Sequence, residues 1–351
     1  MTLVRRHVTH VGALGLSLAV ALGACARDAP TDPAGGDTFT PGAPLAAGVR
    51  VPLTDMGTRT YGAFAGGLFP HGSNAMPGAH AAAGASRAAA IRTRDASGNL
   101  SAGGRYVLLS IGMSNTTQEF SAFITLAAAD AAVDRTRLAI VDGAASGRTA
   151  GSWTMPTSVE YDRILTQLLQ PRGLGERQVA AVWLKVANAG PTRALPDPSS
   201  DAFTLVAQQG QILRALKARY PNLQQVFVSS RIYAGYANTT LNPEPYAYES
   251  GFAAKWLIEA QITQMSGGGT DARAGNLDYA SVVPWVSWGP YLWADGTTAR
   301  SDGVSWVAAD LSSDGTHPST QGRTKVATAL LGVLKASPHA RCWLLAGLTC
   351  P

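Results

Sequence analysis

Short apolar runs alternate with longer amphipathic segments along the last two thirds of the chain. The apolar runs predict strands at 106–112, 137–142, 179–186, 225–230 and 280–286. Helical periodicity predicts helices at 115–132, 159–169, 201–219, 248–265 and 320–335. Runs without polar alternation are typical of parallel strands that are buried on both faces. The pattern predicts one three-layer α/β/α domain with a five-stranded, doubly wound, flavodoxin-like parallel sheet.

The first 24 residues have the pattern of an export signal. Arg5 and Arg6 precede an apolar stretch, 11–22, that is too short to span a bilayer as a mature helix. Residues 22–25, Leu-Gly-Ala-Cys, resemble a bacterial lipobox, in which Cys25 becomes the lipidated first residue. The alternative is ordinary secretion after a cut near Ala24. We expect a cell-envelope lipoprotein anchored in the outer membrane or at the surface, and otherwise a periplasmic or secreted protein.

The region between the signal and the first strand has little hydrophobic periodicity. Residues 25–50 are rich in Pro, Gly, Asp and Thr and predict a disordered tether. The domain is expected over 51–351, with lead-in loops at 51–104 and the α/β core at 105–336. Within the lead-in, 69–80 reads as a loop that wraps over the active face.

Composition narrows the classes of partner. The net charge of +5 is mild and the basic residues are scattered, so nucleic acid is not an expected partner. Cys342 and Cys350 remain after the signal, and an exported protein can join such a pair in a disulfide. The acidic residues do not cluster in a pattern that would hold a metal ion. We therefore expect no metal and no organic cofactor.

Ser114 follows the first predicted strand at the point where a helix should begin. The residues after it, Asn-Thr-Thr-Gln-Glu, suit a helix start. A hydroxyl there lies at the carboxyl end of a strand and the amino end of a helix, where ligands gather and negative charge is favoured. Ser114 is therefore either a nucleophile or a simple helix cap.

A second polar motif, Asp-Gly-Thr-His-Pro at 314–318, follows the last predicted strand. Asp314 and His317 are three residues apart, so the carboxylate can hold the imidazole in one tautomer. The imidazole can then take a proton from a serine hydroxyl. The alternative is an Asp-Gly turn followed by a histidine near a helix start.

Together these two motifs resemble the end blocks of SGNH (GDSL-like) hydrolases. Residues 112–115, Gly-Met-Ser-Asn, are similar to the Gly-Gln-Ser-Asn block of the sialate O-acetylesterase and acetylxylan-esterase-like branch, and 314–318 are similar to the terminal Asp-x-x-His-Pro block. The resemblance covers about 105–335 and implies a serine esterase. In it Ser114 attacks, His317 is the general base and Asp314 orients His317. The Gly-x-Ser-x-Gly motif of α/β-hydrolases is absent, because Thr116 replaces its second glycine.

The middle blocks of the family, which supply oxyanion donors, match less well. Residues 142–149 and Trp153 resemble the second block and make Gly143 and Gly147 the candidate backbone donors, with a plain turn as the alternative. In the third block, Lys185 stands where the carbohydrate-active branch has Gln, and Asn188 fits only with a shifted register. Loss of one oxyanion donor costs about 10²–10³ in rate in a well-studied protease.

Several replacements for that missing donor are open. Lys185 is either a cationic substitute or a strand-end lysine that points to solvent. Asn74 and Arg231 are the other candidate donors. Arg231 could also bind a substrate carboxylate, or pair with Glu244 or Glu249.

The expected substrate is an acylated carbohydrate or another small ester. Aromatic residues at 233–248 and 285–293 suit sugar rings if their faces are exposed, and core packing is the alternative. The sequence therefore predicts a serine esterase that removes acetyl or other short acyl groups from a glycan. A lipid- or thioester-cleaving esterase and a non-catalytic glycan-binding lipoprotein are the alternative functions.

Overall fold

The computed structural model describes residues 2 and 39–350. Apart from Thr2, the expected signal, the lipidation site at Cys25 and the tether up to residue 38 lie outside the described residues. The ordered contacts of the domain begin before the expected boundary at residue 51. Gly42 N donates to Thr58 O at 2.8 Å, and Leu45 N donates to Thr60 O at 2.7 Å.

The core of the fold is a parallel sheet with the predicted topology. Its strands are β3 (Tyr106–Gly112), β4 (Leu138–Asp142), β5 (Val179–Lys185), β6 (Gln225–Val228) and β7 (Trp285–Trp288). The strand order is β4-β3-β5-β6-β7, and every neighbouring pair is parallel. This is the flavodoxin-like order, so the predicted fold class is confirmed.

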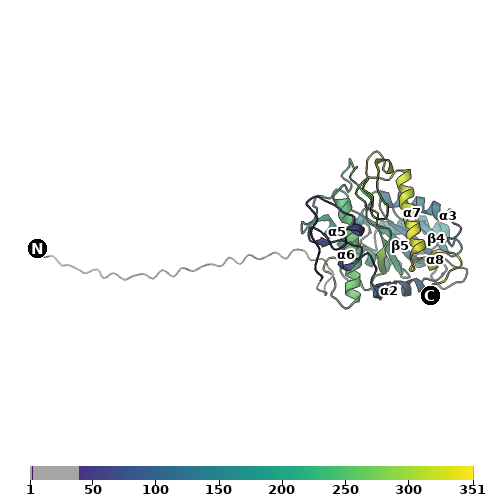
Figure 1. The fold of residues 1–351 in the computed structure, drawn as a ribbon. Coiled ribbons are helices and arrows are strands. Elements are labelled where there is room, and N and C mark those ends of the chain that lie inside the picture. Colours follow the sequence, from purple (N-terminus) through teal and green to yellow (C-terminus); the bar gives the residue numbers. More distant parts are fainter. Residues whose placement is uncertain (1, 3–38, 351) are drawn as a thin grey trace.

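Helices cover both faces of the sheet (Figure 1). The elements on one face are α2 (Gly78–Ala89), α3 (Ser114–Ala129), α7 (Thr320–Ala336) and α8 (Arg341–Leu344). Those on the other are α4 (Val159–Arg163), α5 (Asp201–Arg219) and α6 (Tyr246–Met265). Along β3, Leu109 and Ile111 pack with the second set while Leu108 packs with the first. Apolar side chains on both faces explain the uninterrupted apolar run in the sequence.

Short elements complete the chain. They are α1 (Leu53–Met56), β1 (Thr60–Tyr61), β2 (Phe64–Ala65), a π-helix at Ile164–Leu169, and 3₁₀ turns at Pro70–Gly72, Ala150–Trp153, Gln170–Arg172, Glu176–Gln178 and Ala308–Asp310. The helix expected at 159–169 is thus divided between α4 and the π-helix.

The prediction of loops throughout 51–104 is wrong at α2. This helix is rich in alanine and glycine and has no large apolar side chain to mark its buried face in the sequence. It packs closely because Gly84 has no side chain: a methyl group there would lie 2.5 Å from the Trp285 ring. His80 on the same helix stacks on Trp285 with 5.0 Å between the ring centroids.

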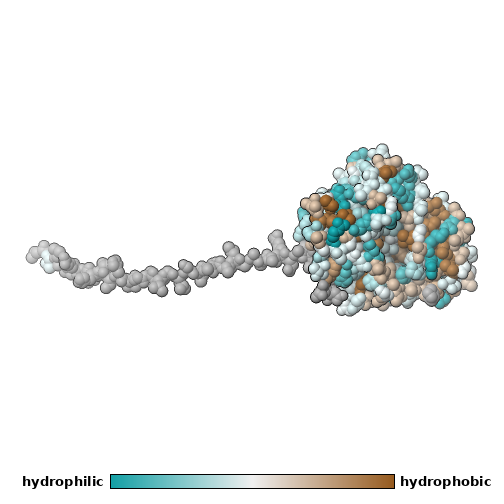
Figure 2. Space-filling model, in the orientation of Figure 1, coloured by the Kyte–Doolittle hydropathy of each residue, from teal (hydrophilic) through white to brown (hydrophobic). Residues whose placement is uncertain are grey.

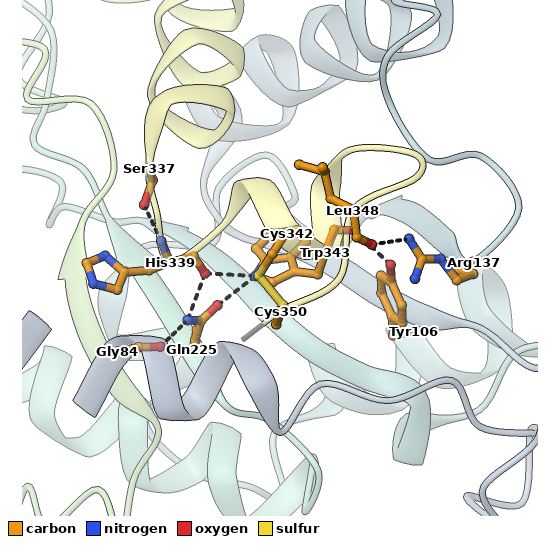
Figure 3. Close-up of a disulfide and its surroundings, with 10 residues drawn as sticks. All are labelled: Gly84, Tyr106, Arg137, Gln225, Ser337, His339, Cys342, Trp343, Leu348 and Cys350. Carbon is orange, nitrogen blue, oxygen red and sulfur yellow. Dashed lines mark hydrogen bonds between the residues drawn. A yellow bond between two sulfur atoms is a disulfide. The ribbon is translucent and has the colours of Figure 1, made fainter. Parts of the chain in front are cut away.

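A disulfide closes the C-terminal segment, which lies beside Tyr106 and Gln225 (Figure 3). It joins Cys342 to Cys350, as expected of an exported protein. Beside it, Trp343 O accepts from Tyr106 OH at 2.7 Å, and Trp343 Nε1 donates to Gln225 Oε1 at 2.9 Å. Since Tyr106 and Gln225 begin β3 and β6, these bonds fix the C-terminal segment to the starts of two strands.

The surface is mixed in polarity. On the face drawn in Figure 2, apolar atoms lie in separate patches among polar ones. Within the part of the chain that the structure describes, none of the helices combines the length and the hydropathy needed to cross a membrane.

Candidate active site

The turn between β3 and α3 places Ser114 at the first position of the helix, with Met113 as the N-cap. Thr116 Oγ1 accepts from Met113 N at 3.2 Å and donates to the Lys185 carbonyl oxygen at 2.6 Å. One hydroxyl thus closes the start of α3 and ties it to the end of β5. The Ser114 N–H, at the first helical position, has no acceptor within the helix and is free to face a ligand.

Gly112 permits this turn because the backbone of β5 passes very close to it. A methyl group at Gly112 would lie 2.2 Å from Lys185 O and 2.4 Å from Thr116 Oγ1. Its φ of 157° is also rare for residues with a side chain. The glycine two residues before Ser114 is therefore required by packing.

We expect Gly112→Ala to destabilise the protein by about 1–3 kcal/mol, because its methyl group must displace either strand β5 or the start of α3. Urea unfolding measures the loss. Gly332→Ala is the matched control, since nothing lies within 4 Å of a methyl group at that helical position. It should stabilise the protein by roughly 0.5–1 kcal/mol. Equal stability of the two variants would contradict the packing argument.

Ser114, His317 and Asp314 form a continuous hydrogen-bonded chain. His317 Nδ1 lies 2.5 Å from Asp314 Oδ2, and Ser114 Oγ lies 2.7 Å from His317 Nε2. An ionised carboxylate can only accept, so the proton is assigned to Nδ1, and Nε2 accepts the hydrogen bond that Ser114 Oγ–H donates. This is the tautomer in which an imidazole can take the proton of a serine nucleophile.

The carboxylate of Asp314 is fixed by the turn that it begins. Its Oδ1 accepts from Thr316 N at 3.0 Å and from His317 N at 2.9 Å. Burial raises the pKa of Asp314, but the hydrogen bonds from His317 and Thr316 outweigh burial and hold the pKa below its usual value. Asp314 is therefore ionised where it faces the imidazole.

The loop at 236–239 packs against this turn and holds it in position. Asn238 N donates to Asp314 O at 3.1 Å, and Asn238 Nδ2 donates to Ser313 O at 3.0 Å. Gly315 has a φ of 62°, and a methyl group there would lie 1.9 Å from Tyr236 O. The Asp-Gly pair thus serves both the turn and the contact with the neighbouring loop.

A cavity of about 370 Å³ opens beside Ser114 and His317. It is lined by residues from the start of α3 and from the loops that follow the carboxyl ends of β4, β5, β6 and β7. These residues are Met113, Ser114, Asn115, Gln118, Ser146, Gly147, Thr149, Ala189, Arg231, Leu241, Thr316 and His317. The carboxyl ends of the parallel strands therefore meet at one site, as the fold predicts.

The two candidate backbone donors of the second block differ. Gly143 N donates to Ser110 Oγ at 3.1 Å, so it is not available to an oxyanion and its predicted role is wrong. Gly147 lines the cavity, and its N–H donates to no group in the described part of the chain. Only Gly147 of the two is placed to assist Ser114.

The predicted side-chain donors of the third block do not reach the cavity. Lys185 is 0% exposed, and its Nζ lies 2.6 Å from both carboxylate oxygens of Glu119, so it neither points to solvent nor faces an oxyanion. Burial lowers the pKa of Lys185 to about 8 and raises that of Glu119, although each charge favours the other. Asn188 Nδ2 donates to Gln208 Oε1 at 2.8 Å. Both side chains are therefore bonded to groups outside the cavity and cannot donate to an oxyanion at Ser114.

The segment at 69–80, expected to wrap over the active face, lies away from the cavity. Asn74 Nδ2 donates to Thr54 O at 2.7 Å, and its Oδ1 accepts from Leu68 N at 3.2 Å. Neither Asn74 nor another residue of 69–80 lines the cavity. The segment packs beside β7 instead, where His80 Nε2 lies 3.0 Å from Val286 O.

The aromatic segment at 285–293 belongs to the core. Trp285, Trp288 and Trp293 are all buried, so the expectation of exposed rings for sugar binding is wrong for them. Their spacing could not reveal this, because an aromatic residue suits a core as well as a binding surface.

Arg231 does line the cavity, but it forms no ion pair with Glu244 or Glu249. Glu244 accepts from Trp293 Nε1 at 2.7 Å, and Glu249 accepts from Leu195 N at 3.1 Å. The alternative of a simple structural pair is therefore wrong.

Gln118 is a cavity residue that the sequence reasoning did not single out. It lies four positions after Ser114 on α3, so the two side chains share one face of the helix. Its Oε1 is buried and has no hydrogen-bond partner. The helical spacing from Ser114 is the signal that could have identified it.

Within residues 39–350, no three or more His, Cys, Asp or Glu side chains come together as a possible metal site.

No known family model matches the chain, and no curated protein matches it either. Solved structures resemble it at low identity. A Parabacteroides merdae protein described as a GDSL-like lipase is 12% identical over 69% of this chain and 97% of its own, with a TM-score of 0.34. A gut microbial diltiazem-metabolizing enzyme is 12% identical over 69% of this chain and 48% of its own, with a TM-score of 0.35. An extracellular lipase from Streptomyces rimosus is 14% identical over 64% of this chain and 99% of its own, with a TM-score of 0.25.

Likenesses this weak carry no argument about activity. The case for a function rests instead on the chain's own hydrogen-bonded serine, histidine and aspartate, and on the sequence blocks that contain them.

Proposed function

We propose that the chain is a serine esterase of the SGNH type that removes acetyl or other short acyl groups. The observation that carries the proposal is the chain of hydrogen bonds from Ser114 Oγ through His317 to Asp314, at 2.7 and 2.5 Å. A serine that only capped the helix would not need an oriented imidazole on its hydroxyl.

In the proposed mechanism, Ser114 Oγ attacks the ester carbonyl carbon while His317 Nε2 takes the hydroxyl proton. Asp314 holds the imidazole in its tautomer and stabilises the positive charge that forms. The N–H groups of Ser114 and Gly147 stabilise the oxyanion, with the positive end of α3 beside it. His317 then protonates the leaving alcohol, and water attacks the acyl-enzyme by the same route to release the acid.

Gln118 supplies the third polar group that the family's third block would otherwise provide. Its side chain lies on the Ser114 face of α3, where Oε1 is buried without a partner and Nε2 is the group that would donate. Lys185 and Asn188 are occupied elsewhere, so the amide of Gln118 is the neutral side chain best placed to donate to the oxyanion or the acyl group.

A glycan is the proposed alcohol part of the substrate, and the support for it is the sequence resemblance to carbohydrate esterases. The tryptophans of 285–293 are buried and therefore give no support for sugar binding.

A panel of p-nitrophenyl esters from acetate to decanoate, together with acetylated sugars, tests both the acyl group and the alcohol of the proposed substrate. Fastest turnover of acetyl esters supports the proposal. Preference for long acyl chains would favour the lipid esterase, and glycan binding without any turnover would favour the binding protein.

We also infer export and lipid attachment at Cys25, which rests on the residue pattern at 22–25. Expression in a bacterial host should place the wild type in the membrane fraction and the Cys25→Ala variant in the soluble fraction. Equal partition of the two proteins would contradict lipid attachment.

A further inference from the structure

Arg231 is the one residue of the Ser114 cavity that carries a permanent charge. It follows β6, is 1% exposed and lines the cavity. A guanidinium has five N–H donors and stays protonated in proteins. Arg231 uses these donors sparingly: Nη2 donates to Thr316 O at 3.5 Å, and Nε is buried without any partner.

The carboxylates nearest to Arg231 are committed to other groups. Glu119 Oε1 and Oε2 both bind Lys185 Nζ at 2.6 Å. Asp314 binds His317, and Glu244 accepts from Trp293 Nε1 at 2.7 Å. These charges offset part of the cost of burying the guanidinium, but they leave its donors unmatched.

The cavity offers no carboxylate of its own. Its lining residues are neutral apart from Arg231 and the titratable His317. The oxygen of a neutral ligand can accept a hydrogen bond from the guanidinium but brings no opposite charge, whereas a carboxylate can accept two parallel, charge-assisted hydrogen bonds from it.

The guanidinium also lies close to the reacting groups. Thr316 O accepts from both Arg231 Nη2 and Asn115 Nδ2, the latter at 3.0 Å. Asn115 adjoins Ser114 in the chain, and Thr316 adjoins His317. An anionic group bound at Arg231 would therefore belong to the same small molecule as an ester carbonyl at Ser114.

We propose that Arg231 forms an anion subsite in the Ser114 cavity, and that the substrate is an ester carrying a carboxylate close to its scissile bond. The inference rests on the esterase function proposed above. It assigns Arg231 to substrate recognition, with the carboxylate bound at the guanidinium while Ser114 attacks the ester carbonyl.

Two acetyl esters of matched shape test the subsite. They are 3-acetoxybenzoate and 3-acetoxybenzamide, which differ chiefly in one negative charge. We expect the wild type to show kcat/KM about tenfold or more higher for the carboxylate, because charge-assisted bonds to a buried guanidinium are strong. Arg231→Gln should bring the ratio near one, and Arg231→Lys should retain part of it. Arg300→Gln, which removes a buried arginine outside the cavity, should leave the ratio unchanged.

A second measurement needs no variant. On the wild type, 3-hydroxybenzoate should inhibit p-nitrophenyl acetate hydrolysis at a lower concentration than 3-hydroxybenzamide, by about the same factor of ten.

Three results would overturn the subsite. They are equal kcat/KM for the two esters in the wild type, a carboxylate preference that survives Arg231→Gln, and an equal loss of rate on both esters in Arg231→Gln. The last result would place the guanidinium on the ester carbonyl that both substrates share. Absence of turnover on either ester, with Ser114 unreactive toward a fluorophosphonate, would overturn the esterase function itself and the subsite with it.

Discussion

Ser114→Ala is expected to lower kcat/KM on p-nitrophenyl acetate by about 10⁴-fold or more. The variant loses the hydroxyl that attacks the carbonyl, and His317 Nε2 loses the group whose proton it takes at 2.7 Å. Neither Gly147 nor Gln118 can replace a nucleophile, so only weak stabilisation of bound ester by the cavity remains. Initial rates with excess ester measure the loss.

Ser121→Ala is the matched control for this substitution. Ser121 lies on the same helix, is exposed, and bonds to Asp142 Oδ2 at 3.3 Å outside the cavity. Its replacement should leave the rate within a few-fold. Circular dichroism and the midpoint of thermal unfolding should match between the two variants. If Ser114→Ala keeps most of the activity, Ser114 is not the nucleophile and only begins the helix.

Removal of one partner from the buried Lys185–Glu119 pair is expected to cost about 3–5 kcal/mol of unfolding free energy. Both side chains are 0% exposed, so a single substitution leaves an unpaired charge in the core. Glu119→Gln should cost more than Lys185→Met. Without Glu119, Lys185 and Arg231 remain as neighbouring buried cations, whereas without Lys185 the guanidinium still offsets part of the charge of Glu119.

A double-mutant cycle separates the pair from the rest of the core. The Glu119→Gln, Lys185→Met double variant should regain part of the stability that either single variant loses, because neither Lys185 nor Glu119 is left without its partner, although Arg231 loses the offsetting charge of Glu119. The surface pair of Lys335 and Asp130 gives the comparison, since Lys335→Met should cost at most about 1 kcal/mol. Urea unfolding of all the variants measures these effects. Strict additivity of the two core substitutions would contradict a coupled pair.

The parts of the site that the sequence predicts are those that follow from strand order. Ser114 and His317 are 203 positions apart, but each follows a strand or precedes a helix at the same sheet edge. Parallel strands place all such positions together, so the apolar pattern predicts that they share one end of the sheet, while the pairing of Ser114 with His317 follows from the two motifs and their resemblance to the family's end blocks. The strand at 106–112 and the helix at 201–219 are predicted at their observed bounds, because an uninterrupted apolar run marks the strand and helical periodicity marks the helix.

The parts that the sequence does not predict depend on contacts between distant side chains. Lys185 looks like a strand-end lysine until Glu119, 66 positions away, is seen beside it. Gly143 looks like an oxyanion donor until Ser110 Oγ is found to accept its N–H. Helix α2 has too few large apolar residues to show a helical stripe, and its glycine-mediated packing on Trp285 becomes visible only in three dimensions.

The central claim is that Ser114 is a nucleophile activated by His317. Incubation with a fluorophosphonate, followed by peptide mass spectrometry, tests it most directly. The account predicts one phosphonyl group on Ser114 in the wild type, slower labelling in His317→Ala, and none in Ser114→Ala. An ester-cleaving wild type that stays unlabelled at Ser114, or carries the label on another serine, would contradict the account.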